Sequence, residues 1–570
     1  MTANRRTFRR RIFAFTLACA FASSLAFAQA TSPPAPAIPA KSVHVQPIGA
    51  YIHATWTTLT RSMSDCKSIA DPKLKTIPVL YLPHDLPMPA DVAAMQRRCR
   101  VRVLRLPVTV TRFGQINPAQ IKTPGLLYLP HPYVVPGGRF NEMYGWDSFF
   151  ILKGLIDDHD VALAQGIVDN FFFEIQHYGG ILNANRTYYF TRSQPPFLSS
   201  MIRAVYRAEV AEGHQKQALA WLARAYTFAQ RDHSVWLLPV HRAGNTGLAR
   251  YFDLGHGPVP EMADDSTYYP DVIRWLLAHP GTHPGYLIHA GRHSSVKERK
   301  RLATLSCNPT HSAVCAHAHV RGYWLTRSFY KGDRAMRESG FDTTFRFGPF
   351  GGSTHHFAPV GLNALLYKYE NDLAWMARTL HKPAQAEKWR HEAAARRAAI
   401  DRYLWNPQKK MYFDYNFVTH KQSNYLFLTA FYPLWTGAAD HAQQKGVLAH
   451  IRDFDYPGGL AISTHRSGVQ WDLPYGWAPT TWIAVQGMLK AGDRADAERI
   501  ATQFNSTVRR VYQKTHNIYE KYDVVNATHH FQVTAGYTQN VIGFGWTNAT
   551  YLEFEPLMRA CAARPSHHRP

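Results

Sequence analysis

PGGRFNEMYGWDSFF, residues 136–150, is the stretch around which the rest of the chain is organised. Gly137 and Gly138 let the backbone approach a ligand closely or take a positive φ. Arg139 offers a planar fork of hydrogen-bond donors, and Trp146 offers an apolar ring face. This combination suits a hydroxylated ligand with an apolar face, such as a sugar ring. Taken alone, however, the stretch indicates a Gly-Gly turn ahead of a buried aromatic helix.

Downstream of this stretch, apolar residues recur at spacings of three and four, which is the period of an amphipathic helix. The pattern predicts helices over 149–156, 162–175, 217–229, 362–380, 384–404, 442–451 and 495–511. Loops rich in glycine, proline and aromatic residues separate these segments. We therefore predict an all-α domain in which helical hairpins form a toroid and the functional loops lie at one rim.

The first residues have the composition of an export signal. Five arginines within residues 5–11 precede an apolar run over 12–25 and a small-residue motif at 26–28, which predicts a signal peptide over 1–28. Residues 4–8, NRRTF, also resemble a twin-arginine signal. The predicted location is therefore periplasmic or secreted.

The remaining segments divide the chain further. Residues 29–50 form a Pro- and Ala-rich leader, residues 51–560 the main domain with an irregular N-terminal segment, and residues 561–570 a tail. No later run of about 20 apolar residues occurs, so we expect no integral membrane segment.

The chain is strongly basic, with a formal net charge of +24 that falls to about +19 without the five arginines of residues 1–28. A positive balance can indicate nucleic acid, an anionic surface or adaptation to the surroundings. The basic residues are scattered apart from a cluster at 292–301, and no nucleic-acid-binding module accompanies it. We expect no nucleic-acid partner, and we expect a monomer.

Five cysteines remain outside the predicted signal, and an oxidising compartment would permit disulfides between them. Proximity favours Cys307 with Cys315 first and Cys66 with Cys99 second, which leaves Cys561 over. No cysteine spacing indicates a zinc site, and we expect no metal.

Two carboxylates could carry chemistry. Asp342 follows a Gly-Phe step, and Glu520 lies between two tyrosines beside Lys521. Glycoside hydrolysis needs one carboxylic acid to protonate the leaving oxygen and a second carboxylate to activate water or attack. Taken singly, either residue could equally be a helix cap or an ion-pair partner.

Taken together, the polar-aromatic blocks resemble the trehalase family of glycoside hydrolases. Residues 136–150 resemble the first family signature and QWDLPYGWAP, residues 470–479, resembles the second. Further resemblance lies in the blocks NRTYYFTRSQPPF (185–197), ESGFDTTFR (338–346), LNALLYKYE (362–370), EKYDV (520–524) and GFGWTN (543–548). The resemblance covers roughly residues 110–555.

The resemblance implies an (α/α)₆ toroid that cleaves α,α-trehalose into two glucose molecules with inversion and without a cofactor. It implies Asp342 as the general acid and Glu520 as the general base, in an inverting pair that admits a water between them. The substrate-holding residues that it implies are Arg139, Phe140, Trp146, Asp147, Asn183, Arg192, Gln194, Arg346 and Trp471.

The chain also departs from the family pattern. Val259 stands where the family usually has an arginine, and Tyr537 stands where a glycine-rich lid would supply a glutamate. Residues 265–335 match the family poorly and are interpreted as an insertion. These departures keep two alternatives open: a related inverting glycosidase acting on another α-linked disaccharide, and a catalytically inactive sugar-binding homologue.

Overall fold

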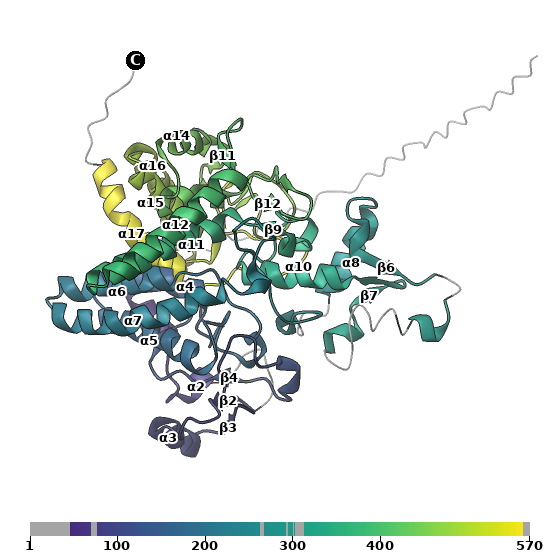
Figure 1. Ribbon diagram of the computed structural model, residues 1–570, viewed down its shortest axis with the longest axis horizontal. Helices are drawn as coiled ribbons and strands as arrows, with labels where there is room; N and C mark the ends of the chain where they lie inside the picture. Colours follow the sequence, from purple (N-terminus) through teal and green to yellow (C-terminus); the bar gives the residue numbers. More distant parts are fainter. Residues whose placement is uncertain are drawn as a thin grey trace, which may run out of the picture. The chain divides into compact units, whose positions relative to one another are not determined.

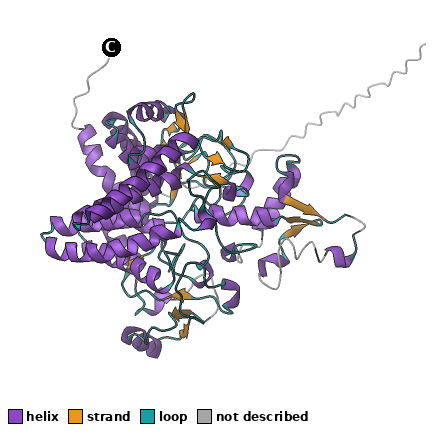
Figure 2. Ribbon diagram, in the orientation of Figure 1, coloured by secondary structure: helices purple, strands orange, loops and turns teal. Residues whose placement is uncertain are grey.

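The computed structural model describes residues 46–69, 77–262, 267–291, 294–299, 301 and 313–562 of the 570-residue chain. Helices make up most of this part, with short strands confined to the connections between them (Figure 2). The predicted signal peptide, most of the predicted leader and all but two residues of the predicted tail lie outside the described residues.

A closed ring of helices forms the centre of the described part. Each of these helices packs against the next, and the last packs back against the first: α4 (Gly145–Asp157), α6 (Leu198–Ala211), α11 (Val360–Thr379), α13 (Tyr432–Thr436), α15 (Ala478–Lys490) and α17 (Gly545–Ala562).

A second layer of helices covers this ring from outside (Figure 1). Helix α5 packs on α4, α7 on α6, α12 on α11, and α16 on both α15 and α17. Their bounds are Val161–His177 for α5, Gln215–Val235 for α7, Pro383–Tyr403 for α12 and Arg494–Thr515 for α16, and α14 spans His441–Ala449. The two layers confirm the predicted all-α (α/α)₆ toroid.

The helices predicted from apolar spacing are present, and side-chain caps explain where some of them begin. The carboxylate of Asp493 accepts a hydrogen bond from the Asp496 N–H at the start of α16. Asp440 and Gln443 form a capping box at the start of α14. Helix α15 escaped prediction because each residue from Ala478 to Val485 is buried, so it has no polar face to reveal its period.

The N-terminal part of the described chain packs onto this body through α1 (Ile48–Leu59), which contacts α17. The same part of the chain contains a three-stranded parallel sheet of order β3-β2-β4, formed by β2 (Val79–Leu82), β3 (Arg102–Arg105) and β4 (Leu126–Leu127). Helix α3 (Ala90–Arg98) connects β2 to β3.

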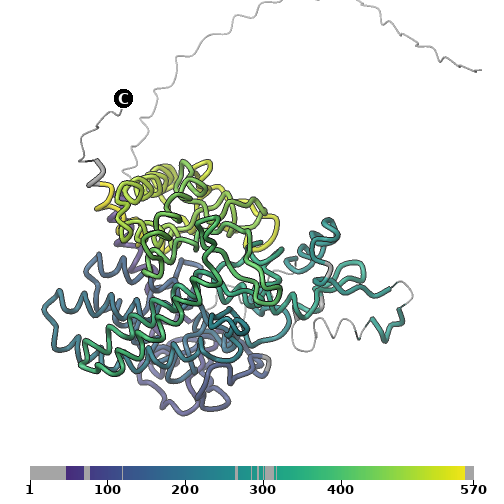
Figure 3. The backbone as a smooth tube through the Cα atoms, turned by 45° about the horizontal axis from the view of Figure 1, so that its top comes forward, coloured from purple at the N-terminus to yellow at the C-terminus, as the bar shows by residue number. Residues whose placement is uncertain are grey.

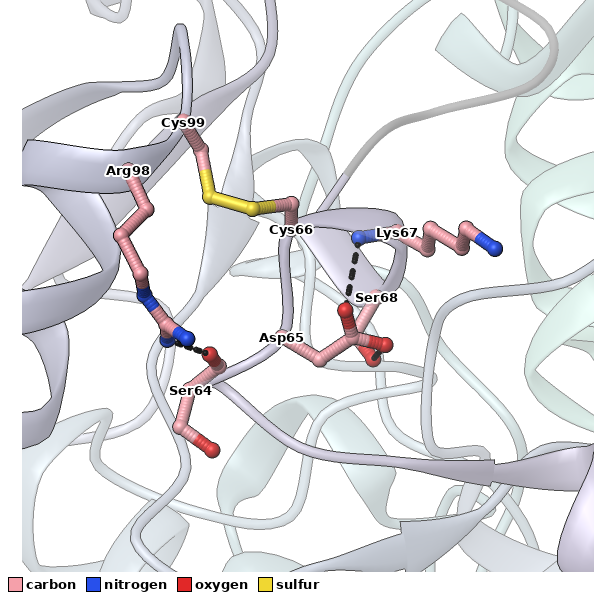
Figure 4. Close-up of a disulfide and its surroundings, with 7 residues drawn as sticks. All are labelled: Ser64, Asp65, Cys66, Lys67, Ser68, Arg98 and Cys99. Atoms are coloured by element: carbon pink, nitrogen blue, oxygen red, sulfur yellow. Dashed lines mark hydrogen bonds between the residues drawn. A yellow bond between two sulfur atoms is a disulfide. The ribbon is translucent and has the colours of Figure 1, made fainter.

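A disulfide joins Cys66, at the start of α2 (Cys66–Ile69), to Cys99, directly after α3 (Figure 4). This bond ties two segments 33 residues apart and confirms the second of the predicted pairs. For the first pair, Cys307 lies outside the described residues, while Cys315 is disulfide-bonded.

The described residues between 268 and 338 carry a smaller substructure, most of whose apolar side chains belong to a second apolar cluster (Figures 1 and 3). Helix α8 (Tyr268–Ala278) packs on a sheet of order β6-β8-β7, formed by β6 (Leu287–His289), β8 (Tyr323–Leu325) and β7 (His319–Val320). Helix α10 (Arg327–Glu338) leads from this sheet back toward the helical ring.

The other strands form short antiparallel ladders in the loops: β1 (Thr60–Arg61) with β5 (Tyr133–Val134), β10 (Trp405–Asn406) with β11 (Met411–Tyr412), β9 (Phe357–Ala358) and β13 (Lys421–Gln422) with β12 (Tyr415–Asn416), β14 (Asp455–Tyr456) with β15 (Gly459–Leu460), and β16 (Tyr475–Trp477) with β17 (Lys521–Asp523). Within the described ranges, no helix has the length and apolar character needed to span a membrane.

Candidate active site

The predicted site residues converge on one cavity of about 1900 Å³. All of them except Arg346 line it: Arg139, Phe140, Trp146, Asp147, Asn183, Arg192, Gln194, Asp342, Trp471 and Glu520. These residues come from segments that are up to about 380 positions apart in the chain. The fold therefore assembles in space what the sequence scatters among loops.

The loops that carry these residues are tied together by backbone and side-chain hydrogen bonds. Strand β16 pairs with β17, so that Trp477 lies opposite Lys521 and the second signature block lies beside Glu520. The side-chain Oε1 of Gln194 accepts a hydrogen bond of 2.9 Å from the backbone N–H of Trp146 in the first turn of α4. Gln194 thus satisfies a helix-end donor that would otherwise have no partner.

Indole rings form one wall of the cavity. Trp471 stacks on Trp477 with 3.6 Å between ring centroids, and Trp146 contacts Trp471 and Trp546 at 5.9 and 5.7 Å. Gly340, at φ 76°, lies against Trp146, and a Cβ there would come within 2.9 Å of the indole. The wall offers the apolar surface on which the carbon face of a sugar ring can pack.

Asp342 lies in the loop after α10, with its side chain 22% exposed toward the cavity. Arg337 Nη1 lies 3.5 Å from Asp342 Oδ2. Burial raises the pKa of Asp342 to about 7, although the positive charges of Arg337 and Arg192 act to lower it. A carboxyl group with this pKa remains protonated in mildly acidic solution, which is what a general acid requires.

Glu520 has different surroundings, although its side chain is similarly exposed, at 16%. The ammonium group of Lys521 donates to Glu520 Oε2 at 2.5 Å. The backbone carbonyl of Glu520 accepts from Trp546 Nε1 at 3.0 Å, and this bond holds the residue against the indole wall. An adjacent cation favours the ionised carboxylate, which is the form that a general base needs.

Asp147 lines the cavity in the first turn of α4, close to both of these carboxyl groups. Burial raises its pKa well above the ordinary value, and the negative charges of Glu520 and Asp342 raise it further. A carboxyl group kept protonated can donate a hydrogen bond to a substrate hydroxyl as well as accept one.

A network of buried ion pairs forms the wall beside Asp342. Arg192 donates to Glu261 and lies 3.6 Å from Asp253, which also faces Arg334 at 3.1 Å. Despite its burial, the pKa of Asp253 is lowered by Arg334 and Arg192. Because these side chains are buried and paired, their donors are held in place before a ligand arrives.

Arg346 does not line the cavity. Its guanidinium group forms a bidentate ion pair with Asp414, with Nε 2.7 Å from Oδ2 and Nη2 2.6 Å from Oδ1. The Asp414 carboxylate also accepts a hydrogen bond from the Val360 N–H at the start of α11. Both side chains are fully buried. The structure thus makes Arg346 a link between the loop of Asp342 and α11.

Sequence reasoning missed two residues that line the cavity, Arg337 and Glu261. It singled out Tyr537 and Lys521 without assigning either a role in the site: Tyr537 also lines the cavity, and Lys521 contacts Glu520. Its position could have identified Arg337. It directly precedes the block at residues 338–346 that contains Asp342, in the last turn of the helix that leads to this block. Glu261 is recognisable only through its contact with Arg192, 69 residues away in the chain.

Val259, where the family pattern has an arginine, packs in the apolar cluster of residues 268–338 and is fully buried. Its N–H donates to the Tyr269 hydroxyl at 3.0 Å. Its neighbours Pro258, Pro260 and Glu261 line the cavity instead. Arg192, Arg334 and Arg337 are among the cations that line the cavity.

Comparisons with known proteins agree with this site. The trehalase family profile matches residues 37–271 and 292–558. A cytosolic neutral trehalase of Neurospora crassa is 33% identical, over 87% of this chain and 71% of the relative. A cytosolic neutral trehalase of Saccharomyces cerevisiae is 32% identical, over 87% and 69%. The structure of the neutral trehalase Nth1 from S. cerevisiae matches with a TM-score of 0.73 and 29% identity, over 92% of this chain and 98% of that one.

The comparisons contradict the predicted periplasmic or secreted location. Several curated relatives that the chain matches are cytosolic proteins by name. Arginines ahead of an apolar run satisfy the composition of a signal peptide, but composition does not establish that export machinery recognises the segment. The prediction of export is therefore wrong.

Proposed function

Because the chain belongs to the trehalase family and is a glycosidase of the trehalase type, we propose that it hydrolyses α,α-trehalose to two glucose molecules with inversion at one anomeric carbon. In this proposal the Asp342 carboxyl group protonates the glycosidic oxygen as the bond breaks. Glu520 removes a proton from the water that attacks the opposite face of the sugar ring.

The observation that carries the proposal is the contrast between two carboxyl groups of one cavity. Burial raises the pKa of Asp342 to about 7, so this group is protonated below neutral pH. The Lys521 ammonium lies 2.5 Å from Glu520 and is a cationic partner for this carboxylate. An inverting glycosidase needs one protonated and one ionised carboxyl group at the same time.

The remaining walls support sugar binding on either side of the reacting bond. The stacked indoles can pack against the carbon face of a pyranose ring, and the arginines can donate several hydrogen bonds to its hydroxyls. Asp147 lies near both Asp342 and Glu520 and is suited to holding a hydroxyl close to the scissile bond.

A second candidate is a related inverting glycosidase that acts on another α-linked disaccharide. It is favoured by the two departures from the family pattern, because the buried Val259 side chain cannot hydrogen-bond a substrate hydroxyl and Tyr537 brings a phenol to the cavity.

Proton NMR on the full chain with trehalose, maltose and kojibiose tests both candidates. Inversion of one residue of α,α-trehalose releases one α- and one β-glucose, so equal early signals of the two anomers are expected from trehalose. Early α-glucose alone would overturn inversion. Faster turnover of maltose or kojibiose than of trehalose would favour the second candidate, and no turnover of any of them would overturn the proposed activity.

A further inference from the structure

Residues 533–541 form a loop that crosses the cavity beside Asp342. The loop is tied at one end by the Thr534 N–H, which donates to the Gly468 carbonyl at 2.9 Å. At its other end the Val541 carbonyl accepts from the Glu520 N–H at 2.9 Å. The loop is therefore attached to the walls that carry the second signature block and Glu520.

Gly536 brings this loop into close contact with the segment of Asp342. Its φ of 103° is a conformation that other residues rarely adopt, and a Cβ there would lie 2.9 Å from Thr343 Oγ1. The close approach places the next residue of the loop, Tyr537, beside the segment that carries Asp342.

The Tyr537 hydroxyl shares an arginine nitrogen with Asp342. Arg337 Nη1 donates to the Tyr537 oxygen at 3.3 Å and to Asp342 Oδ2 at 3.5 Å. When the phenol oxygen accepts from Arg337, its own O–H remains available to donate into the cavity. Nη1 carries two N–H groups, so it can donate to both oxygens, and the phenol and the carboxyl group hold the same guanidinium nitrogen between them at long hydrogen-bond distances.

We propose that Tyr537 is a positioning residue for Asp342, which sets how strongly Arg337 stabilises the ionised carboxylate and thereby adjusts the alkaline limit of the reaction. This inference rests on the proposed role of Asp342 as general acid. It adds a residue that acts through Arg337 and that faces the leaving sugar.

The charges around the two groups define what Tyr537 can change. The charged groups that face Asp342 are the cations of Arg337, Arg192 and Lys521 and the carboxyl groups of Glu261 and Asp147. The groups that face Tyr537 are Arg337, Arg192, Glu261, Asp342 and Tyr144. Burial raises the pKa of Tyr537 above its ordinary value, so the phenol is neutral throughout the working range. Tyr537 therefore orients a positive charge without neutralising it.

Tyr537→Phe and Tyr537→Glu should shift the pH dependence of kcat/KM in opposite directions. In Tyr537→Phe the Arg337 nitrogen has only Asp342 as a partner, which favours the ionised form of Asp342. The alkaline limb of the kcat/KM profile should therefore move to lower pH by roughly 0.5 unit. In Tyr537→Glu the new carboxylate would pair with Arg337 and repel the ionised form of Asp342. The alkaline limb of the kcat/KM profile should therefore move to higher pH by roughly 1 unit. A purely structural role would lower kcat in both variants without opposite shifts.

Tyr323→Phe, a hydroxyl deletion on β8 away from the cavity, is the matched control and should leave the limb in place. An unmoved limb in Tyr537→Phe, or shifts of the same sign in both variants, would overturn the inference. If Tyr537→Glu fails to fold by circular dichroism, Tyr537→Phe alone decides the matter. Asp342→Asn separates the two proposals: retained turnover in that variant would overturn the acid role itself, whatever Tyr537 does.

Discussion

Asp342 and Glu520 are exposed to nearly the same extent, 22% and 16%, and yet the cations beside them are arranged differently. Asp342 faces the guanidinium of Arg337 at 3.5 Å, but this group is also shared with Asp333 at 3.4 Å and with Tyr537. Glu520 has the ammonium group of its neighbour at 2.5 Å. Exposure therefore does not separate the two roles; the distance and the sharing of the nearby cation do.

The largest expected effect comes from neutralising each carboxyl group. Asp342→Asn cannot donate the proton and Glu520→Gln cannot accept one, so each should lower kcat on trehalose by about 10³-fold or more. Steady-state kinetics by glucose release measures the loss.

Asp157→Asn is the control for Asp342, because burial and Glu553 raise the pKa of Asp157 to about 7 although it does not line the cavity. Its kcat should be unchanged. Activity near the unmodified level in Asp342→Asn or Glu520→Gln would contradict the roles assigned to them.

Removing the cation beside Glu520 tests the other half of the comparison. In Lys521→Met the ionised carboxylate loses its 2.5 Å partner, so the acidic limb of kcat/KM should move to higher pH and the rate at pH 5 should fall about tenfold. Lys153→Met removes a similar 2.6 Å pair with Glu553 outside the cavity and should leave the profile unchanged. An acidic limb that stays in place in Lys521→Met would show that this ammonium does not keep the base ionised.

The unmodified enzyme should lose activity on the alkaline side of neutrality. With its pKa raised to about 7, Asp342 is protonated below that pH and loses its proton above it. The value of kcat/KM should therefore fall by about tenfold per pH unit well above pH 7. A profile of kcat/KM that is flat to pH 9 would contradict the assignment of Asp342 as general acid.

Much of this fold was predictable because outer helices reveal their period. Helices α7 and α12 alternate buried and exposed positions, whereas α15 is buried over residues 478–485 and shows no such pattern. Proximity in sequence also ranked Cys307 with Cys315 ahead of the Cys66–Cys99 bond, which the crossover of β2 and β3 brings together. Tertiary contacts of this kind leave little local signal.

The site was predictable where its residues lie within the recognisable blocks, and less so where partners come from other loops. Arg346 lies in such a block, but its Nε and Nη2 both donate to Asp414, 68 residues away. The contact of Arg337 with Tyr537 spans 200 residues. Long-range pairs of this kind decide which arginine faces the cavity, and only the folded chain specifies them.

The smallest expected effect is on stability, and here the two carboxyl groups should differ in sign. The folded-state pKa of Asp342 is raised, so its contribution is favourable at low pH and is lost as the pH rises from about 4 through about 7. Asp342→Asn should therefore raise the free energy of unfolding at pH 8 by on the order of 2 kcal/mol and change it little at pH 4. Glu520→Gln leaves the buried Lys521 ammonium without its carboxylate and should lower the free energy of unfolding at pH 8 by about 2 kcal/mol or more. Urea unfolding at the two pH values measures both, and changes of the same sign would mean that the two sites do not differ electrostatically as described.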